Sequence, residues 1–252
     1  MKLGSLIKKS LVEQLRHTIN KAGLYFIFNA LRRARGFPPV GDADSSITDR
    51  FEGIYSSGDW VHRKGQESRS GLGSELSSTD RLRTLLPHVF RITEAKVVGD
   101  VGCGDWNWMR EVDLSAVTYL GFDIVASVVE QNNKKYGSDV CRFECLDAIN
   151  ESIPECDLLI CREVLFHLSF HGAIETLSNM IASSKWILLT CDYSTWINSD
   201  IPTGDFRALN LEAAPFNFPP PLMTLSDSEV AAGRVMGLWQ SSSISTPAFK
   251  RC

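Results

Sequence analysis

The sequence contains no Cys-x-x-Cys pair, no apolar run long enough to cross a bilayer and no excess of positive charge. Its seven cysteines are scattered, mostly within apolar runs, which indicates free thiols and argues against a disulfide framework or a zinc knuckle. The apolar stretch 22–31 is too short for a transmembrane helix and lacks the pattern of a secretory signal. A net charge of −4 argues against a protein that binds nucleic acid through bulk positive charge.

The charge is unevenly distributed along the chain. Residues 1–40 hold eight lysines and arginines against Glu13 alone, a net charge of +7, so the remaining residues carry −11. Apolar residues recur in the first 35 positions at roughly helical spacing. Three interpretations remain open: an interfacial helix that gives peripheral membrane contact through residues 1–36, an import presequence, or a helix that packs on its own domain or a partner.

Two regions are predicted. Residues 1–46 form a basic, helical amphipathic extension that ends in a linker, and residues 47–252 form one globular domain. Since the chain has neither a membrane span nor a secretory signal, we expect a cytoplasmic protein, with membrane contact limited to the extension.

Strands and helices alternate through the domain, which predicts an α/β fold. Ser78 or Thr79 is expected to cap a helix through about Val89. Strands are predicted at 96–101, 118–122, 140–145, 157–161 and 186–190, helices at 106–112, 125–136 and 169–182, and an antiparallel hairpin at 222–225 and 234–240. The expected architecture is therefore Rossmann-like: a mostly parallel, seven-stranded sheet with helices on both faces and an antiparallel C-terminal hairpin.

Two long connections have no clear periodicity. Residues 56–78 are rich in Ser and Gly yet contain Trp60 and Arg69, so both a flexible loop and an ordered lid are consistent with them. Residues 192–222 are rich in proline and aromatic residues, and they fit either a recognition loop or a proline-stiffened loop that packs on the sheet.

The stretch GDVGCGDWNWM carries the strongest functional signal. Gly102 and Gly104 follow an apolar strand and permit a tight turn that a ligand can approach closely. Asp123 ends the next strand, 21 residues after Gly102, a suitable distance for a carboxylate that binds ribose hydroxyls. A dinucleotide site would have a third glycine where Asn107 stands, and Asp105 would repel a pyrophosphate. Acids around the loop instead favour a cationic cofactor, S-adenosylmethionine.

Four motifs together resemble the class I S-adenosylmethionine-dependent methyltransferase family over about residues 75–245. They are VVGDVGCG, YLGFDI, FECLDA and CDLLICREVLFHLS, in the order and spacing of the family. The chain departs from the family's Gly-x-Gly-x-Gly pattern at Trp106. The resemblance implies S-adenosylmethionine as cofactor, S-adenosylhomocysteine as product, and cofactor contacts from Asp100, Gly102, Cys103, Gly104, Asp123, Ile124, Asp147, Ala148, Cys161 and Arg162.

The acceptor is predicted to be a small molecule or a glycan, methylated on a hydroxyl oxygen. Glu163 and His167, in the turn after the fourth strand, are the candidates for the base that removes the acceptor proton. Trp60, Asp192 and Arg207 are the candidates for acceptor binding, as an aromatic platform with polar groups at its rim. His167 and His171 would not share one helical face, so no metal is expected.

Two other functions remain as alternatives. One is a non-catalytic S-adenosylmethionine-binding protein that its basic N-terminus recruits to a membrane or a partner. The other, a nicotinamide oxidoreductase, is disfavoured by Asp105 and Asn107. Nucleic acid is not expected as acceptor, because the acidic domain offers no basic groove.

Overall fold

The computed structural model describes residues 46–61 and 64–244. The extension predicted for residues 1–46, apart from Ser46, and the proposed membrane contact through residues 1–36 lie outside these ranges. Among the helices that the structure describes, none has both the length and the apolar character needed to cross a membrane.

Seven strands form one sheet in the order β3-β2-β1-β4-β5-β7-β6. The first five strands are parallel to one another, whereas β7 runs antiparallel to both β5 and β6, as predicted. The chain moves outward from β1 to β3 and restarts beside β1 at β4, so a crevice opens at the strand ends between β1 and β4. The strands are β1 (Val97–Val101), β2 (Thr118–Asp123), β3 (Cys141–Cys145), β4 (Cys156–Cys161), β5 (Ser184–Asp192), β6 (Met223–Ser226) and β7 (Arg234–Gln240).

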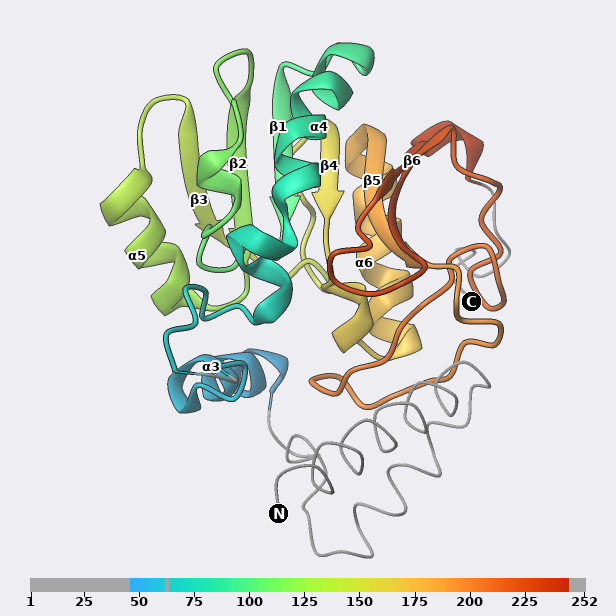
Figure 1. The fold of residues 1–252 in the computed structure, drawn as a ribbon, viewed down its shortest axis with the longest axis horizontal. Helices are drawn as coiled ribbons and strands as arrows, with labels where there is room; N and C mark the ends of the chain where they lie inside the picture. Colours follow the sequence, from blue (N-terminus) through green and yellow to red (C-terminus); the bar gives the residue numbers. More distant parts are fainter. Residues whose placement is uncertain (1–45, 62–63, 245–252) are drawn as a thin grey trace, which may run out of the picture.

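Helices cover both faces of the sheet (Figure 1). On one face α4 (Asp80–Ile92) packs with Val98 and Leu158, and on the other α6 (Phe170–Ser183) packs with Val101 and Leu159. Because alternate residues of β1 and β4 face the two layers, these strands are apolar along most of their length. The helix α5 (Ala126–Tyr136) lies beside β3, and α3 (Ile47–Ser57) lies below the ends of the parallel strands.

One local prediction was wrong. The helix expected at 106–112 is only the 3₁₀ turn Met109–Glu111, because Trp106 has φ of 56°, which a right-handed helix excludes. Thr79 occupies the N-cap position of α4, one of the two predicted, although its hydroxyl donates to the Glu75 carbonyl and makes no capping bond. The cap expected at Ser169 is confirmed, since its hydroxyl accepts from the Gly172 amide at 3.2 Å.

Candidate active site

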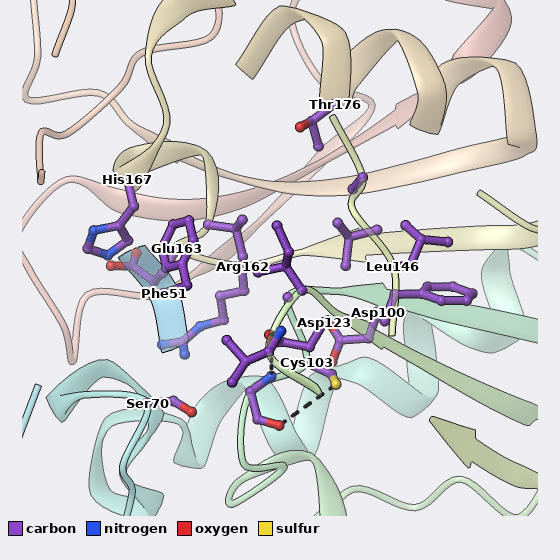
Figure 2. Close-up of a pocket in the computed structure, with 18 of the residues that line it drawn as sticks. Phe51, Ser70, Asp100, Cys103, Asp123, Leu146, Arg162, Glu163, His167 and Thr176 are labelled. Carbon is purple, nitrogen blue, oxygen red and sulfur yellow. Dashed lines mark hydrogen bonds between the residues drawn. The ribbon is translucent and has the colours of Figure 1, made fainter. Parts of the chain in front are cut away.

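A cavity lies between α3 and the ends of β1, β2 and β4. Figure 2 shows residues that line it. One part of its wall is the glycine end, which we define by Gly102–Gly104, Asp123 and Asp147. The other part is the histidine end, defined by Phe51, Trp60, Glu163 and His167. All the residues of both ends line the same cavity, so the structure brings together groups that lie more than 100 positions apart in the sequence.

The glycine turn is held by hydrogen bonds from neighbouring elements. The Gly104 amide donates to Asp123 Oδ2 at 2.9 Å, and Asn132 Nδ2 of α5 donates to the Gly104 carbonyl at 2.7 Å. Gly102 and Gly104 have φ of 75° and 55°, in the left-handed region that favours glycine. A Cβ at Gly102 would lie 2.2 Å from Val164 Cγ2, and one at Gly104 would lie 2.3 Å from Ser70 Oγ. Both glycines are therefore required by the packing of the protein itself.

Trp106 occupies the third position of this turn, where the family pattern has glycine. Its φ of 56° shows that the backbone here is left-handed, which explains the usual preference for glycine. The indole is buried and packs against the rings of Tyr119, Tyr136 and Phe143, with centroids 4.9–5.5 Å away. This aromatic packing offsets the conformational cost of a non-glycine residue.

Carboxylates dominate the glycine end. Asp123 accepts bonds from the backbone amides of Gly104 and Val125, and burial raises its pKa although these bonds oppose the rise. Asp147 begins the turn after β3 and accepts from the Ile149 amide at 2.9 Å. Ile124 and Ala148, which follow the two acids, also line the cavity.

Asp100 lies on β1 beneath the glycine turn and lines the cavity. Burial raises its pKa to about 7, against the hydrogen bond that it accepts from Tyr119 Oη at 2.7 Å. The nearby Asp123 raises the pKa further. A cationic ligand beside Asp100 and Asp123 would stabilise their charged forms, which burial and mutual repulsion disfavour.

The serine-rich segment is an ordered cover in its described parts, residues 56–61 and 64–78. Asp105 accepts bonds from Ser68 Oγ, the Arg69 amide and Ser70 Oγ, so it anchors this segment and does not line the cavity. Of the acids around the glycine loop, Asp105 thus serves the cover, whereas Asp100 lines the cavity. Tyr55 of α3 is 2.6 Å from Ser70 Oγ, and Asn107 donates to the Ser74 carbonyl at 3.0 Å.

His167 is oriented by one backbone contact. Its Nδ1 is 2.8 Å from the Asp205 carbonyl oxygen, and because a carbonyl only accepts, Nδ1 carries the proton and Nε2 carries the lone pair. Burial lowers the pKa of this imidazole, with a smaller opposing effect of the Asp205 carbonyl. His167 is therefore neutral near pH 7 and able to accept a proton at Nε2.

Glu163 follows β4 with φ of 66°, uncommon for a residue other than glycine. Its amide donates to Thr190 Oγ1 at 2.9 Å, and its carboxylate pairs with Arg234. The side chain is 21% exposed and lines the cavity. A strained residue fixed from both its backbone and its side chain is typical of a functional position.

Three residues proposed from the sequence do not line the cavity. Cys161 is buried in the core, where burial raises the pKa of its thiol. Asp192 is buried and accepts from Arg234 Nε at 3.2 Å and from Ser194. Arg207 is buried and donates to the carbonyls of Ser199 and Leu165, so it fastens residues 193–222, which form no helix or strand, to the turn after β4.

Sequence reasoning missed several supporting residues. Helix α3 contributes Phe51 and Tyr55 to the cavity wall. The helical spacing of Phe51, Ile54 and Tyr55 in the sequence indicates this buried face. Asn132 is a further missed residue, since it is buried on α5 and bonds to the glycine turn. Arg162 was proposed for the cofactor, yet it forms a bidentate pair with Asp227 at 2.9 and 3.0 Å, for which no local pattern exists.

The site fits no obvious metal centre. Among the described residues, no group of three or more His, Cys, Asp or Glu is placed to hold a metal ion. His171 is exposed on α6, whereas His167 faces the cavity.

No protein-family model matches the sequence, and no curated protein matches it. Solved structures do match. A magnesium protoporphyrin IX methyltransferase from Synechocystis PCC 6803, crystallised with S-adenosylmethionine, is 15% identical and has a TM-score of 0.54 over 79% of this chain and 98% of its own. The N-methyltransferase NodS from Bradyrhizobium japonicum WM9, with S-adenosylhomocysteine, is 13% identical and has a TM-score of 0.53 over 77% and 98%. The fold is therefore that of the class I methyltransferases, as predicted.

Proposed function

We propose that this protein transfers a methyl group from S-adenosylmethionine to a hydroxyl oxygen of a small-molecule or glycan acceptor. The observation that carries the proposal is the single cavity in which the glycine turn and Asp123 face the same space as His167 and Glu163. Such an arrangement supplies both a nucleoside site and a proton acceptor within one pocket.

The lining fits a cationic cofactor. Asp100, Asp123 and Asp147 lie in the cavity wall, and the one arginine among the described lining residues, Arg162, is already paired with Asp227. This charge suits an ammonium and a sulfonium and would repel a pyrophosphate. Asp123, at the end of β2, is placed to accept bonds from ribose hydroxyls, and Ile124 and Ala148 provide apolar contacts beside it.

S-adenosylmethionine, when bound, supplies an electrophilic methyl group on sulfur. The residues of the histidine end then have two tasks. His167 Nε2 takes the proton that the acceptor hydroxyl loses as its oxygen forms the new bond to carbon, and Glu163 orients the acceptor or the imidazolium that results. The bound cofactor would supply the leaving group as well, since S-adenosylhomocysteine would carry away the electron pair of the sulfur–methyl bond. Residues of α3 and of the serine-rich segment form part of the cavity wall and reduce the access of solvent to these steps.

Calorimetric titration with S-adenosylmethionine and, separately, NADH tests the cofactor. We expect binding of S-adenosylmethionine alone, and its loss in Asp123→Ala. Release of S-adenosylhomocysteine in the presence of a panel of hydroxylated acceptors tests catalysis. His167→Ala should reduce turnover by about 10²–10⁴-fold with little change in cofactor affinity, whereas the exposed His171→Ala should leave turnover unchanged. Cofactor binding without turnover on any acceptor would favour the non-catalytic alternative.

For the basic extension, we propose peripheral membrane contact of a cytoplasmic protein through residues 1–36. The eight cations against one acid within residues 1–40 support attraction to anionic lipid. Sedimentation with vesicles of phosphatidylserine and phosphatidylcholine should show binding that weakens as salt rises. Unchanged binding after deletion of residues 1–36 would refute this proposal.

A further inference from the structure

The histidine end is walled by aromatic rings. The Trp60 indole lies 5.2 Å from the His167 imidazole and 6.2 Å from the Phe51 ring, measured between centroids. Phe51, Glu163 and His167 lie at the same end of the view in Figure 2. Flat faces of this kind favour a planar, apolar ring in the acceptor.

Buried ion pairs fix the charge of this end. Arg234 of β7 is 4% exposed, lies over the Phe166 ring at 4.6 Å, and pairs with both Glu163 and Asp192. One guanidinium thus serves two carboxylates, Glu163 in the cavity wall and Asp192 outside it. The charge of Arg207 also acts on His167, but Arg207 is buried outside the cavity and donates to two backbone carbonyls. Since the Glu163 backbone is also bonded to Thr190, the carboxylate has little freedom to turn away from the cavity.

Arg162, which lines the cavity, is also bonded to other residues of the protein. Arg162 forms its bidentate pair with Asp227 and donates a third bond to the Gly73 carbonyl at 2.8 Å. Its guanidinium lies over the Trp108 ring, 5.2 Å from the centroid. Of the described residues that line the cavity, none is lysine and Arg162 is the one arginine. An anionic group on the acceptor would meet the Glu163 carboxylate without gaining a cation from these residues.

We propose that the histidine end is a charge filter that admits an aromatic acceptor in a neutral or cationic form and rejects one that carries a carboxylate or phosphate, and that Glu163, held by Arg234, is the residue that enforces the selection. This inference rests on the proposed function, because it assigns the acceptor to this end of the cavity. It makes Glu163 a determinant of specificity in addition to its place beside His167.

Three probes with the same ring and different charge test the filter. Tryptamine is cationic near pH 7, tryptophol is neutral and indole-3-propionate is anionic. Each is titrated into the full-length protein, alone and saturated with S-adenosylhomocysteine, and binding is followed by calorimetry and ligand-observed NMR. Tryptamine and tryptophol should bind, and indole-3-propionate should bind at least about tenfold more weakly.

Glu163→Gln keeps the shape of the side chain and removes its charge. It should weaken tryptamine binding by about tenfold and shrink the difference between tryptamine and indole-3-propionate, with tryptophol little affected. Glu130→Gln, on the exposed face of α5, is the matched control and should change none of the three.

The outcomes separate the two proposals. Equal binding of the anionic and cationic probes to the wild-type protein overturns the charge filter, and this comparison requires no variant to fold. Failure of all three probes to bind overturns the aromatic site. Failure of S-adenosylhomocysteine to bind contradicts the proposed function instead, and the probe titrations without it still measure the charge preference.

Discussion

The two ends of the cavity are held in place by different interactions. At the glycine end, backbone amides and one buried amide side chain bond to residues no more than 28 positions away. At the histidine end, Glu163 and Asp192 pair with an arginine 71 and 42 positions away, on the opposite side of β5 from β4. The first end is thus a local consequence of strand-turn-helix geometry, and the second depends on the completed sheet. Perturbations of the two ends should differ accordingly.

The largest expected effect is at the histidine end. Arg234→Met leaves two carboxylates buried or half-buried without their partner, so we expect the free energy of unfolding to fall by about 3–5 kcal/mol. Urea denaturation followed by fluorescence measures this. The control is Arg81→Met, which removes an exposed pair with Glu229 and should cost less than about 1 kcal/mol. Equal losses of stability in the two variants would show that the pairs of Arg234 with Glu163 and Asp192 contribute no more than an exposed ion pair.

A smaller loss is expected at the glycine end. In Gly102→Ala the new methyl group would meet Val164 at 2.2 Å and the backbone would keep a positive φ, so we expect about 2–4 kcal/mol of destabilisation and weaker binding of S-adenosylmethionine. Adding Val164→Ala should recover the steric part of the loss only. Gly53→Ala, on α3 with nothing within 4 Å of the new methyl group, should not destabilise the protein. Full recovery in the double variant would mean that the backbone strain is negligible.

The raised pKa of Asp100 at the glycine end should be detectable as a release of protons when a cationic ligand binds. Since burial raises the pKa of Asp100 to about 7, the folded state holds a proton there that the unfolded state loses near pH 4, and stability should fall as pH rises from 4 to 7. A cationic ligand lowers this pKa, so S-adenosylmethionine binding near pH 7 should release a fraction of a proton. Calorimetry in buffers of different ionisation enthalpy measures the release. An unchanged release in Asp100→Asn would assign the proton to another group.

The smallest effect concerns the contact that joins the cover to the glycine turn. Tyr55→Phe removes the 2.6 Å hydrogen bond to Ser70 and should cost about 1 kcal/mol of stability, with weaker cofactor binding because Ser70 also bonds to Asp105. Tyr193→Phe removes an exposed bond of the same length to Glu212 and is the control. If both variants bind S-adenosylmethionine like the wild type, the cover does not support the glycine end.

This contrast also explains what the sequence could predict. The mostly parallel sheet with its antiparallel hairpin and the positions of Gly102, Gly104, Asp123 and Asp147 follow from local patterns, because a turn after a strand must lie at the end of the sheet. The burial of Asp192 and Arg207 did not follow, since both polar side chains find partners only in the folded chain. Nothing near Glu163 in the sequence indicates that Arg234 would hold it.

Glu163 and Arg234 are tied to the sheet, which has a consequence for engineering. Residues 193–222 connect β5 to β6, and within them the Asp205 carbonyl contacts His167 and Arg207 bonds to the turn after β4. None of residues 193–222 lines the described cavity. A library that randomises this connection outside Asp205 and Arg207 should therefore leave the proposed charge preference unchanged. Reversing that preference would require replacement of Glu163 together with Arg234, because Glu163→Gln alone only removes the negative charge.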